Sequence, residues 1–228
     1  MSLHPEAAAL NDSIRSANPS VASVLSERGQ SIYFPKSGIL SQTAEAKGKK
    51  INATIGSALE DSGMPMHLKS IRKNILLDPK DVFPYAPSGG IADIRDVWRK
   101  RIYNYNPSLG DAVISQPVVT SALTHGLSIG GYLFCNPHDE IIIPDLFWGN
   151  YRLILSINYQ ATFKTFDTFA GDEFNVDGLR ATLMSGEPGK RLVVLNFPNN
   201  PTGYTPTATE AVAIRDTLVE AAEAGNDI

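Results

Sequence analysis

The sequence has little cysteine, little histidine and no excess of charge of one sign. Only 1 of its 228 residues is cysteine and 4 are histidine, so an internal disulfide is excluded. No group of His, Cys, Asp and Glu has the spacing of metal ligands. The 20 basic and 24 acidic side chains are interspersed and give a formal net charge of -4. This balance argues against binding to nucleic acid or to an anionic membrane surface.

Long apolar runs and a secretory leader pattern are also missing. The segment from Met1 to Leu10 has neither the basic nor the apolar region of a signal peptide, and no apolar run approaches the length of a membrane-spanning helix. The lone Cys135 has no activating neighbours, so we interpret it as a small apolar side chain rather than a nucleophile. We therefore expect a cytoplasmic protein with no membrane partner.

Residues 1–50 are polar and rich in small side chains, with few apolar residues. Such a segment cannot by itself bury enough apolar surface to offset the entropy lost on ordering. We expect it to pack on a neighbouring domain or to reach onto a partner subunit.

Apolar runs of strand length alternate with helical patterns in the rest of the chain. The predicted strands are 113–120, 140–144, 161–166 and 191–197. The predicted helices are a short one within 66–75, then 90–105, about 124–134, about 148–158, 176–183, and a last helix with Thr205 as N-cap that ends at Gly225. This alternation predicts an α/β fold, a three-layer α-β-α sandwich with a mostly parallel sheet.

In such sheets ligands bind beyond the carboxyl ends of the strands, and the loops found there are unusual. After Thr120 the sequence 121–126 places hydroxyl groups at a helix start, which favours a phosphate site, although simple N-capping explains the same residues. In the second loop, Trp148 provides a flat face for an aromatic ligand or simply belongs to the core.

The third loop holds Asn199 and Asn200 between Pro198 and Pro201. Two prolines restrict the backbone on either side of the asparagines, which presents an amide donor rigidly and exceeds what an ordinary turn requires. A fourth segment, 83–90, contains Tyr85 and is otherwise a glycine- and proline-rich connector.

Taken together, these segments resemble the class I and II aminotransferases of pyridoxal-phosphate fold type I, above all the aspartate and aromatic aminotransferase branch. The resemblance runs in order through 52–56, 85–90, 122–124, 148–150 and 199–203, and covers roughly residues 30–228. It implies an N-terminal arm and the start of a small domain in 1–62, followed by the first part of a large cofactor-binding domain in 63–228.

The resemblance implies roles for individual residues toward pyridoxal 5'-phosphate. Asn200 would donate a hydrogen bond to the phenolic oxygen of the cofactor, and Trp148 would stack on its pyridine ring. Leu123 and Thr124, with Ala122 beside them, would bind the phosphate. Because the aspartate enzymes carry serine and glycine where this chain has Ala122 and Leu123, one hydroxyl contact to the phosphate is lost.

Two further roles involve the substrate and a second subunit. By resemblance, Tyr85 would reach the cofactor phosphate of the neighbouring subunit, which implies a homodimer with shared active sites. Ile55 and Gly56 would line the pocket near the substrate carboxylate.

Two residues that this chemistry needs are missing from the sequence. By resemblance, an aspartate for the pyridine nitrogen and the lysine that holds the cofactor covalently come later in the family, and no lysine follows Lys190 here. Asp227 lies on the wrong side of the expected strand for the pyridine role. We expect both groups to lie beyond Ile228 and the 228-residue chain alone to be inactive.

The activity implied is amino-group transfer between an aspartate-like or aromatic amino acid and a 2-oxo acid. One alternative is another enzyme of fold type I, such as a C–S β-lyase or a cyclopropane-forming synthase of the ACC-synthase kind. The other is a non-catalytic binding or assembly module. His125 contacts cofactor or substrate in one interpretation and is satisfied by local backbone in the other.

Overall fold

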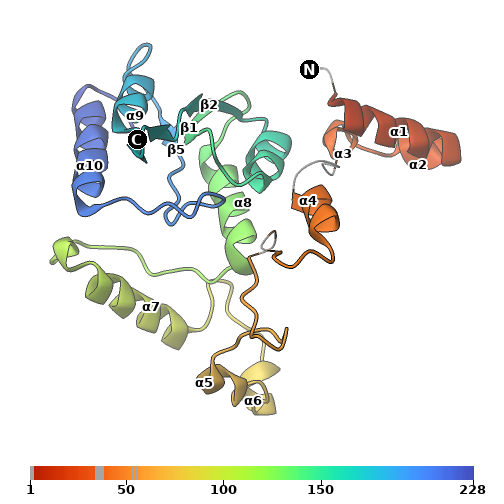
Figure 1. Ribbon diagram of the computed structural model, residues 1–228, viewed down its shortest axis with the longest axis horizontal. Helices are drawn as coiled ribbons and strands as arrows, with labels where there is room; N and C mark the ends of the chain where they lie inside the picture. Colours follow the sequence, from red (N-terminus) through yellow and green to blue (C-terminus); the bar gives the residue numbers. More distant parts are fainter. Residues whose placement is uncertain (1–2, 34–38, 53, 55) are drawn as a thin grey trace. The chain divides into compact units, whose positions relative to one another are not determined.

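The computed structural model describes residues 3–33, 39–52, 54 and 56–228 (Figure 1). They form two compact units: the residues up to 32 together with 121–228, and residues 33–120. The predicted boundary at residue 62, between the segment with the arm and the start of a small domain and the segment with the first part of a large domain, stays a prediction.

The first unit contains a three-stranded parallel sheet. Strand β1 (Glu140–Pro144) lies between β2 (Thr162–Phe166) and β5 (Leu192–Val193), with Ile142 opposite Lys164 on one side and Val193 on the other. A separate antiparallel pair joins β3 (Phe169–Ala170) and β4 (Glu173–Phe174). The prediction of a mostly parallel sheet is confirmed.

Strand β1 is the centre of the core because three consecutive isoleucines, 141 to 143, are almost completely buried. Successive side chains of a strand point to opposite faces, so Ile142 packs on one side and its two neighbours pack on the other. A continuous apolar run is what a strand covered on both faces requires.

Helices cover both faces, which confirms the three layers (Figure 1). On the side of Ile142, α9 (Val176–Leu183) and α10 (Ala208–Glu223) bury Leu179, Leu183, Ile214 and Ala221. On the other side, α8 (Ala122–Phe134) and the π-helix η2 (Arg152–Ile157) complete a core that contains Ile154 and Leu155, with Cys135 packed against it.

Three element predictions need correction. Residues 113–120 form no strand in the structure: Val119 N–H donates to Gly89 O (3.1 Å) and Arg95 Nε donates to Pro117 O (2.6 Å), so the segment packs within the second unit. The predicted strand 191–197 is reduced to β5. Val194 N–H still donates to Ile142 O, but the chain then turns into the proline-bounded loop.

The third correction concerns the last helix. Its N-cap is Thr207 rather than Thr205, because Thr207 and Glu210 form a reciprocal capping box in which each side chain accepts from the other residue's backbone N–H. Helix α9 spans the predicted residues 176–183, and the predicted helix 148–158 becomes a short helix whose middle is η2.

Three short helices precede the second unit: α1 (Pro5–Ala17), α2 (Pro19–Ser23) and α3 (Glu27–Ser31). Asn18 ends α1 and caps α2 by accepting from Ser20 N–H and Val21 N–H. Asn11 is buried and donates to Gln30 O (2.7 Å), which ties α1 to α3.

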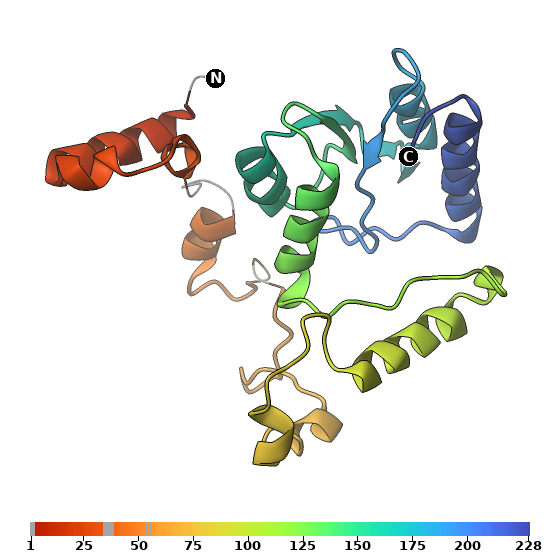
Figure 2. The same ribbon diagram turned by 180° about the vertical axis from the view of Figure 1, so that it is seen from behind.

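The second unit is built of short helices and loops (Figure 2). Its elements are α4 (Ile39–Ala46), α5 (Lys69–Arg72), α6 (Pro79–Val82), α7 (Ala92–Tyr105) and the 3-10 turn η1 (Pro107–Leu109). The apolar stripe of α7 keeps about half of its surface exposed, as at Val97 and Trp98. Among the described residues, no helix has the length and apolar character needed to cross a bilayer.

Candidate functional site

The carboxyl ends of β1 and β2 are joined by a polar network. Asp145 N–H donates to Phe166 O, and Asp145 Oδ1 accepts from both the N–H and the hydroxyl of Thr168. The Thr168 hydroxyl also accepts from Leu146 N–H (3.1 Å). Partial burial raises the pKa of Asp145, but its hydrogen bonds from Thr168 and the backbone outweigh burial and hold that pKa below its usual value. Asp145 therefore stays ionised and fixes the start of the Trp148 loop.

The loop after β5 is closed on itself by Asn199. Asn199 N–H donates to Tyr204 O (2.7 Å), and Gly203 N–H donates to Asn199 O (2.6 Å). The side-chain oxygen of Asn199 accepts from the N–H and the hydroxyl of Thr202, while its amide donates to Leu146 O (3.2 Å). One buried side chain thus links the loop after β5 to the loop after β1.

The two asparagines that the sequence presents as a pair have different environments. Asn199 is 6% exposed and uses both ends of its amide, whereas Asn200 is exposed. Within the described part of the chain, no hydrogen bond of the Asn200 side chain is found. Of the pair, Asn200 is therefore the exposed residue and Asn199 the buried one that holds the loop, and the predicted contact of Asn200 with the cofactor stays a prediction.

Trp148 lies at the boundary between core and surface. Its ring meets Tyr151 edge to face at 5.6 Å, and it packs half-buried against the core that contains Ile154. Leu127, one turn into α8, packs on the same core. The first turns of α8 and the Trp148 loop therefore share one face of the sheet.

The start of α8 is open to solvent. Leu123 is 82% exposed, Thr124 is exposed, and Ala122 adopts a left-handed backbone conformation with φ of 62°. The N-cap residue Ser121 makes no side-chain capping bond, and its N–H donates to His125 Nδ1 (3.0 Å). The interpretation of His125 as a residue satisfied by local backbone is correct. An exposed helix start is a place where the helix dipole favours an anion.

A carboxylate holds the other end of the Asn200 loop. Glu210 is buried and accepts from the hydroxyl of Tyr204, from Phe174 N–H (2.7 Å) and from the N–H and hydroxyl of Thr207. The Tyr204 hydroxyl, then the backbone donors, lower the pKa of Glu210 to about 2. Glu210 is not among the site residues predicted from the sequence, although the spacing of Thr207 and Glu210 carries the capping-box signal.

The remaining predicted site residues lie in the second unit or outside the described residues. Tyr85 is fully exposed, and Gly56 has no atom within 4 Å of where a Cβ would stand. Both belong to the second unit. Ile55 lies outside the described residues, so its predicted contact with substrate stays a prediction.

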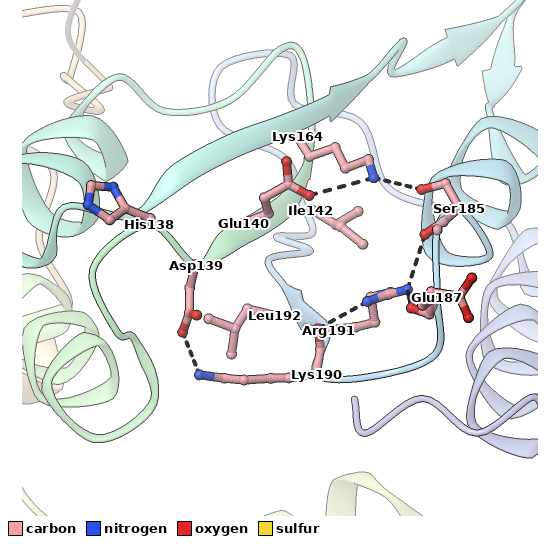
Figure 3. A pocket seen from close by; sticks show the side chains of 11 residues that line it. His138, Asp139, Glu140, Ile142, Lys164, Ser185, Glu187, Lys190, Arg191 and Leu192 are labelled. Atoms are coloured by element: carbon pink, nitrogen blue, oxygen red, sulfur yellow. Dashed lines mark hydrogen bonds and ion pairs between the residues drawn. The ribbon is translucent and has the colours of Figure 1, made fainter.

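A cavity of about 330 Å³ lies at the opposite, amino end of the strands (Figure 3). Most of its charged side chains have partners: Lys190 pairs with Asp139, Lys164 lies 3.6 Å from Glu140, and Arg191 donates to backbone oxygens that include Leu183 O and Glu187 O. The cavity is therefore lined by two ion pairs and by an arginine whose donors bind backbone oxygens. Among the described residues, no group of three or more His, Cys, Asp or Glu could hold a metal ion.

Known proteins with similar sequences are aminotransferases. The family described as aminotransferase class I and II matches residues 48–222. An aromatic-amino-acid aminotransferase 2 from Thermococcus litoralis is 26% identical over 216 residues, which are 93% of this chain and 49% of that protein. The mitochondrial aspartate aminotransferase of Schizosaccharomyces pombe is 28% identical over 169 residues, 71% of this chain and 38% of its own length.

Solved structures agree on the fold. An aminotransferase from Anaerococcus prevotii has a TM-score of 0.69 at 24% identity, with 88% of this chain and 51% of that chain covered. The cytoplasmic aspartate aminotransferase of Saccharomyces cerevisiae has a TM-score of 0.68 at 22% identity, with 83% and 48% covered. The chain spans about half the length of these relatives or less. Because the family match covers most of its residues, the chain belongs to the class I and II aminotransferase family.

Proposed function

We propose that this chain supplies the cofactor-binding part of a pyridoxal-phosphate-dependent aminotransferase that transfers an amino group between an aspartate-like or aromatic amino acid and a 2-oxo acid. The observation that carries the proposal is the closed loop 199–204, which buries Asn199 and displays the amide of Asn200 next to the loop of Trp148. The names of the relatives support the same class of substrate.

The donors at the carboxyl end of the sheet fit the cofactor. Trp148 offers a ring face for stacking, and the exposed Asn200 amide offers an N–H for a phenolic oxygen. Leu123 and Thr124, with Ala122 beside them, lie at an exposed helix start, where backbone N–H groups and the Thr124 hydroxyl suit a phosphate. When bound, pyridoxal phosphate supplies an electron sink for the amino acid's α-carbon.

The chain's own residues then have separate tasks. Asn200 would donate a hydrogen bond to the phenolic oxygen of the cofactor and hold it in place. Trp148 would cover one face of the ring and exclude water from it. Thr124 would hold the phosphate and so keep the ring in register with the other two residues.

The same proposal includes a homodimer in the cytoplasm. Tyr85 is fully exposed and belongs to the second unit, which suits a residue that reaches the phosphate site of a second subunit. Gly56 and Ile55 would line the substrate pocket. In the domain division that accompanies this proposal, residues 1–62 are the arm and the start of the small domain, and 63–228 are the first part of the large domain.

The test is an absorption spectrum of the chain extended through the family's lysine, mixed first with pyridoxal phosphate and then with glutamate. We expect a band of bound cofactor that glutamate bleaches, and we expect the Asn200→Ala variant to shift that band. Assays with glutamate, aspartate, tyrosine and cystathionine run in parallel. Pyruvate and ammonia release without amino transfer would indicate a lyase, and the absence of a band would leave Asn200, Trp148 and Thr124 as structural residues.

A further inference from the structure

One side chain connects the two loops on which Trp148 and Asn200 lie. Asn199 Nδ2 donates to Leu146 O at 3.2 Å, although the two residues are 53 positions apart in the sequence. Leu146 is two residues before Trp148, and Asn199 directly precedes Asn200. Among the contacts found in the described residues, this is the hydrogen bond that joins these two loops directly.

The Leu146 backbone is held from both sides. Its N–H donates to the Thr168 hydroxyl (3.1 Å), which itself donates to Asp145 Oδ1 (2.7 Å), and its carbonyl accepts from Asn199. Thr168 is almost completely buried. The two peptide units that flank the Leu146 Cα are thus each held by one hydrogen bond, and the second, on the side toward Trp148, is held by Asn199. The direction in which the chain leaves toward Trp148 therefore depends on the Asn199 bond.

Asn199 is equally fixed within its own loop. Its Oδ1 accepts from Thr202 N–H (3.1 Å) and Thr202 Oγ1 (2.8 Å), and its backbone bonds to Tyr204 and Gly203 close the loop around Asn200. The amide cannot turn over without breaking these bonds, because its oxygen end is used twice and its nitrogen end once. Its orientation is therefore determined by its partners.

We propose that Asn199 is a positioning residue that sets the offset between the indole of Trp148 and the amide of Asn200. A flat ring that carries an acceptor oxygen needs its stacking surface and its in-plane donor at a fixed offset, and Asn199 provides that offset without touching the ring. The ligand named here rests on the proposed function, whereas the effect on the loops does not.

The test uses the 228-residue chain with Trp98→Phe, which leaves Trp148 as the sole tryptophan. Asn199→Asp keeps an oxygen for Thr202 but places an acceptor opposite Leu146 O, so it breaks the bond between the loops. The matched control, Thr202→Val, removes the hydroxyl bonds inside the loop but keeps the Thr202 N–H that donates to Asn199 Oδ1, so the amide keeps its orientation and the Leu146 bond stays in place. Asn199→Ser, whose side chain is too short to reach Leu146, is the second variant in case the aspartate variant does not fold.

Two measurements separate positioning from binding. In the absence of ligand, acrylamide should quench Trp148 fluorescence more strongly in both Asn199 variants than in the parent, with Thr202→Val unchanged. With pyridoxamine phosphate, whose amine does not condense with surface lysines, Trp148 fluorescence reports binding. The dissociation constant should rise about tenfold in Asn199→Asp, because the loss of a partly buried hydrogen bond has an effect of that size, and should stay near the parent value in Thr202→Val.

Each result bears on one proposal. The positioning role would be overturned if acrylamide quenched Trp148 equally in the parent and in the Asn199 variants. It would also be overturned if quenching increased equally in the Asn199 variants and in Thr202→Val. Failure of pyridoxamine phosphate to quench Trp148 in the parent would count against the proposed cofactor site, while the ligand-free comparison would still decide the role of Asn199.

Discussion

Single carboxylates and amides determine how the loops of the site are held. Glu210 illustrates this, because four groups donate to one buried side chain at the start of α10. A buried acceptor with that many partners is costly to alter, since each donor is left without its partner.

We predict that Glu210→Gln lowers the free energy of unfolding by about 1–3 kcal/mol at pH 7. Glutamine keeps one acceptor but turns an NH₂ group toward the Thr207 N–H, which has no acceptor left. Urea unfolding of the variant and the parent measures the change. The control is Glu220→Gln, which removes an exposed pair with Arg180 (3.0 Å) and should cost less than about 1 kcal/mol.

The effect of Glu210 should depend on pH. Because its folded-state pKa is lowered to about 2 from the ordinary 4.5, its contribution is present above pH 4.5 and is lost as the pH falls toward 2. The stability difference between parent and Glu210→Gln should therefore shrink between pH 5 and pH 2. A difference that stays constant across this range would contradict the assignment of an ionised Glu210.

At the scale of single elements, α8 provides a matched pair of glycines. A Cβ on Gly131 would lie 2.6 Å from ring carbons of Tyr159, whose hydroxyl is bound to Ser128 O (2.7 Å) and cannot easily move. A Cβ on Gly130 meets nothing within 4 Å. We predict that Gly131→Ala destabilises the chain by about 1–3 kcal/mol, whereas Gly130→Ala stabilises it by about 0.5–1 kcal/mol. Thermal melts of both variants measure the changes in stability. If both variants changed stability in the same direction, α8 would not pack on Tyr159 in this way.

The start of α10 provides a second pair of variants, one at the observed N-cap and one at the predicted N-cap. Thr207→Ala removes the capping hydroxyl that accepts from Glu210 N–H (3.2 Å) and should lower stability by about 0.5–2 kcal/mol. Thr205→Ala, at the N-cap expected from the sequence alone, should leave stability unchanged. Equal losses of stability in the two variants, measured by urea unfolding, would contradict Thr207 as the N-cap.

The sequence predicts an element when the element's own residues determine its structure, and it fails when a contact distant in the sequence does. The isoleucines of β1 and the residues of α9 carry their own pattern, so both were located correctly. The segment 113–120 has the apolar character of a strand, but strand formation requires a neighbour, and its backbone bonds go to Gly89 and Arg95 instead. The sequence assigns a role to Asn200 by resemblance but none to Asn199, because the partner of Asn199, the Leu146 carbonyl, is distant in the sequence.

At the scale of the whole molecule, the two units differ in how much apolar surface they bury. The sheet and its helices bury Ile141, Ile142 and Ile143, whereas Leu76 and Phe83 of the second unit are more than 80% exposed. Opening free energies follow burial, so protection should be uneven along the chain.

We predict that backbone amides in residues 140–144 exchange with deuterium at least about a hundredfold more slowly than those in 56–90. Hydrogen exchange followed by mass spectrometry measures both segments in one experiment, and limited proteolysis should cut first within 56–90. Similar protection of the two segments would mean that the second unit has a core of its own.

The packing of Cys135 has a practical consequence for protein chemistry. Its thiol lies at the end of α8 against the core, and burial, followed by the nearby Asp139 carboxylate, raises its pKa above the usual value. At neutral pH the thiolate is scarce, so alkylating reagents will react slowly at this position. A cysteine introduced on the exposed surface should then be labelled selectively with a fluorophore or spin label, without first removing the native one.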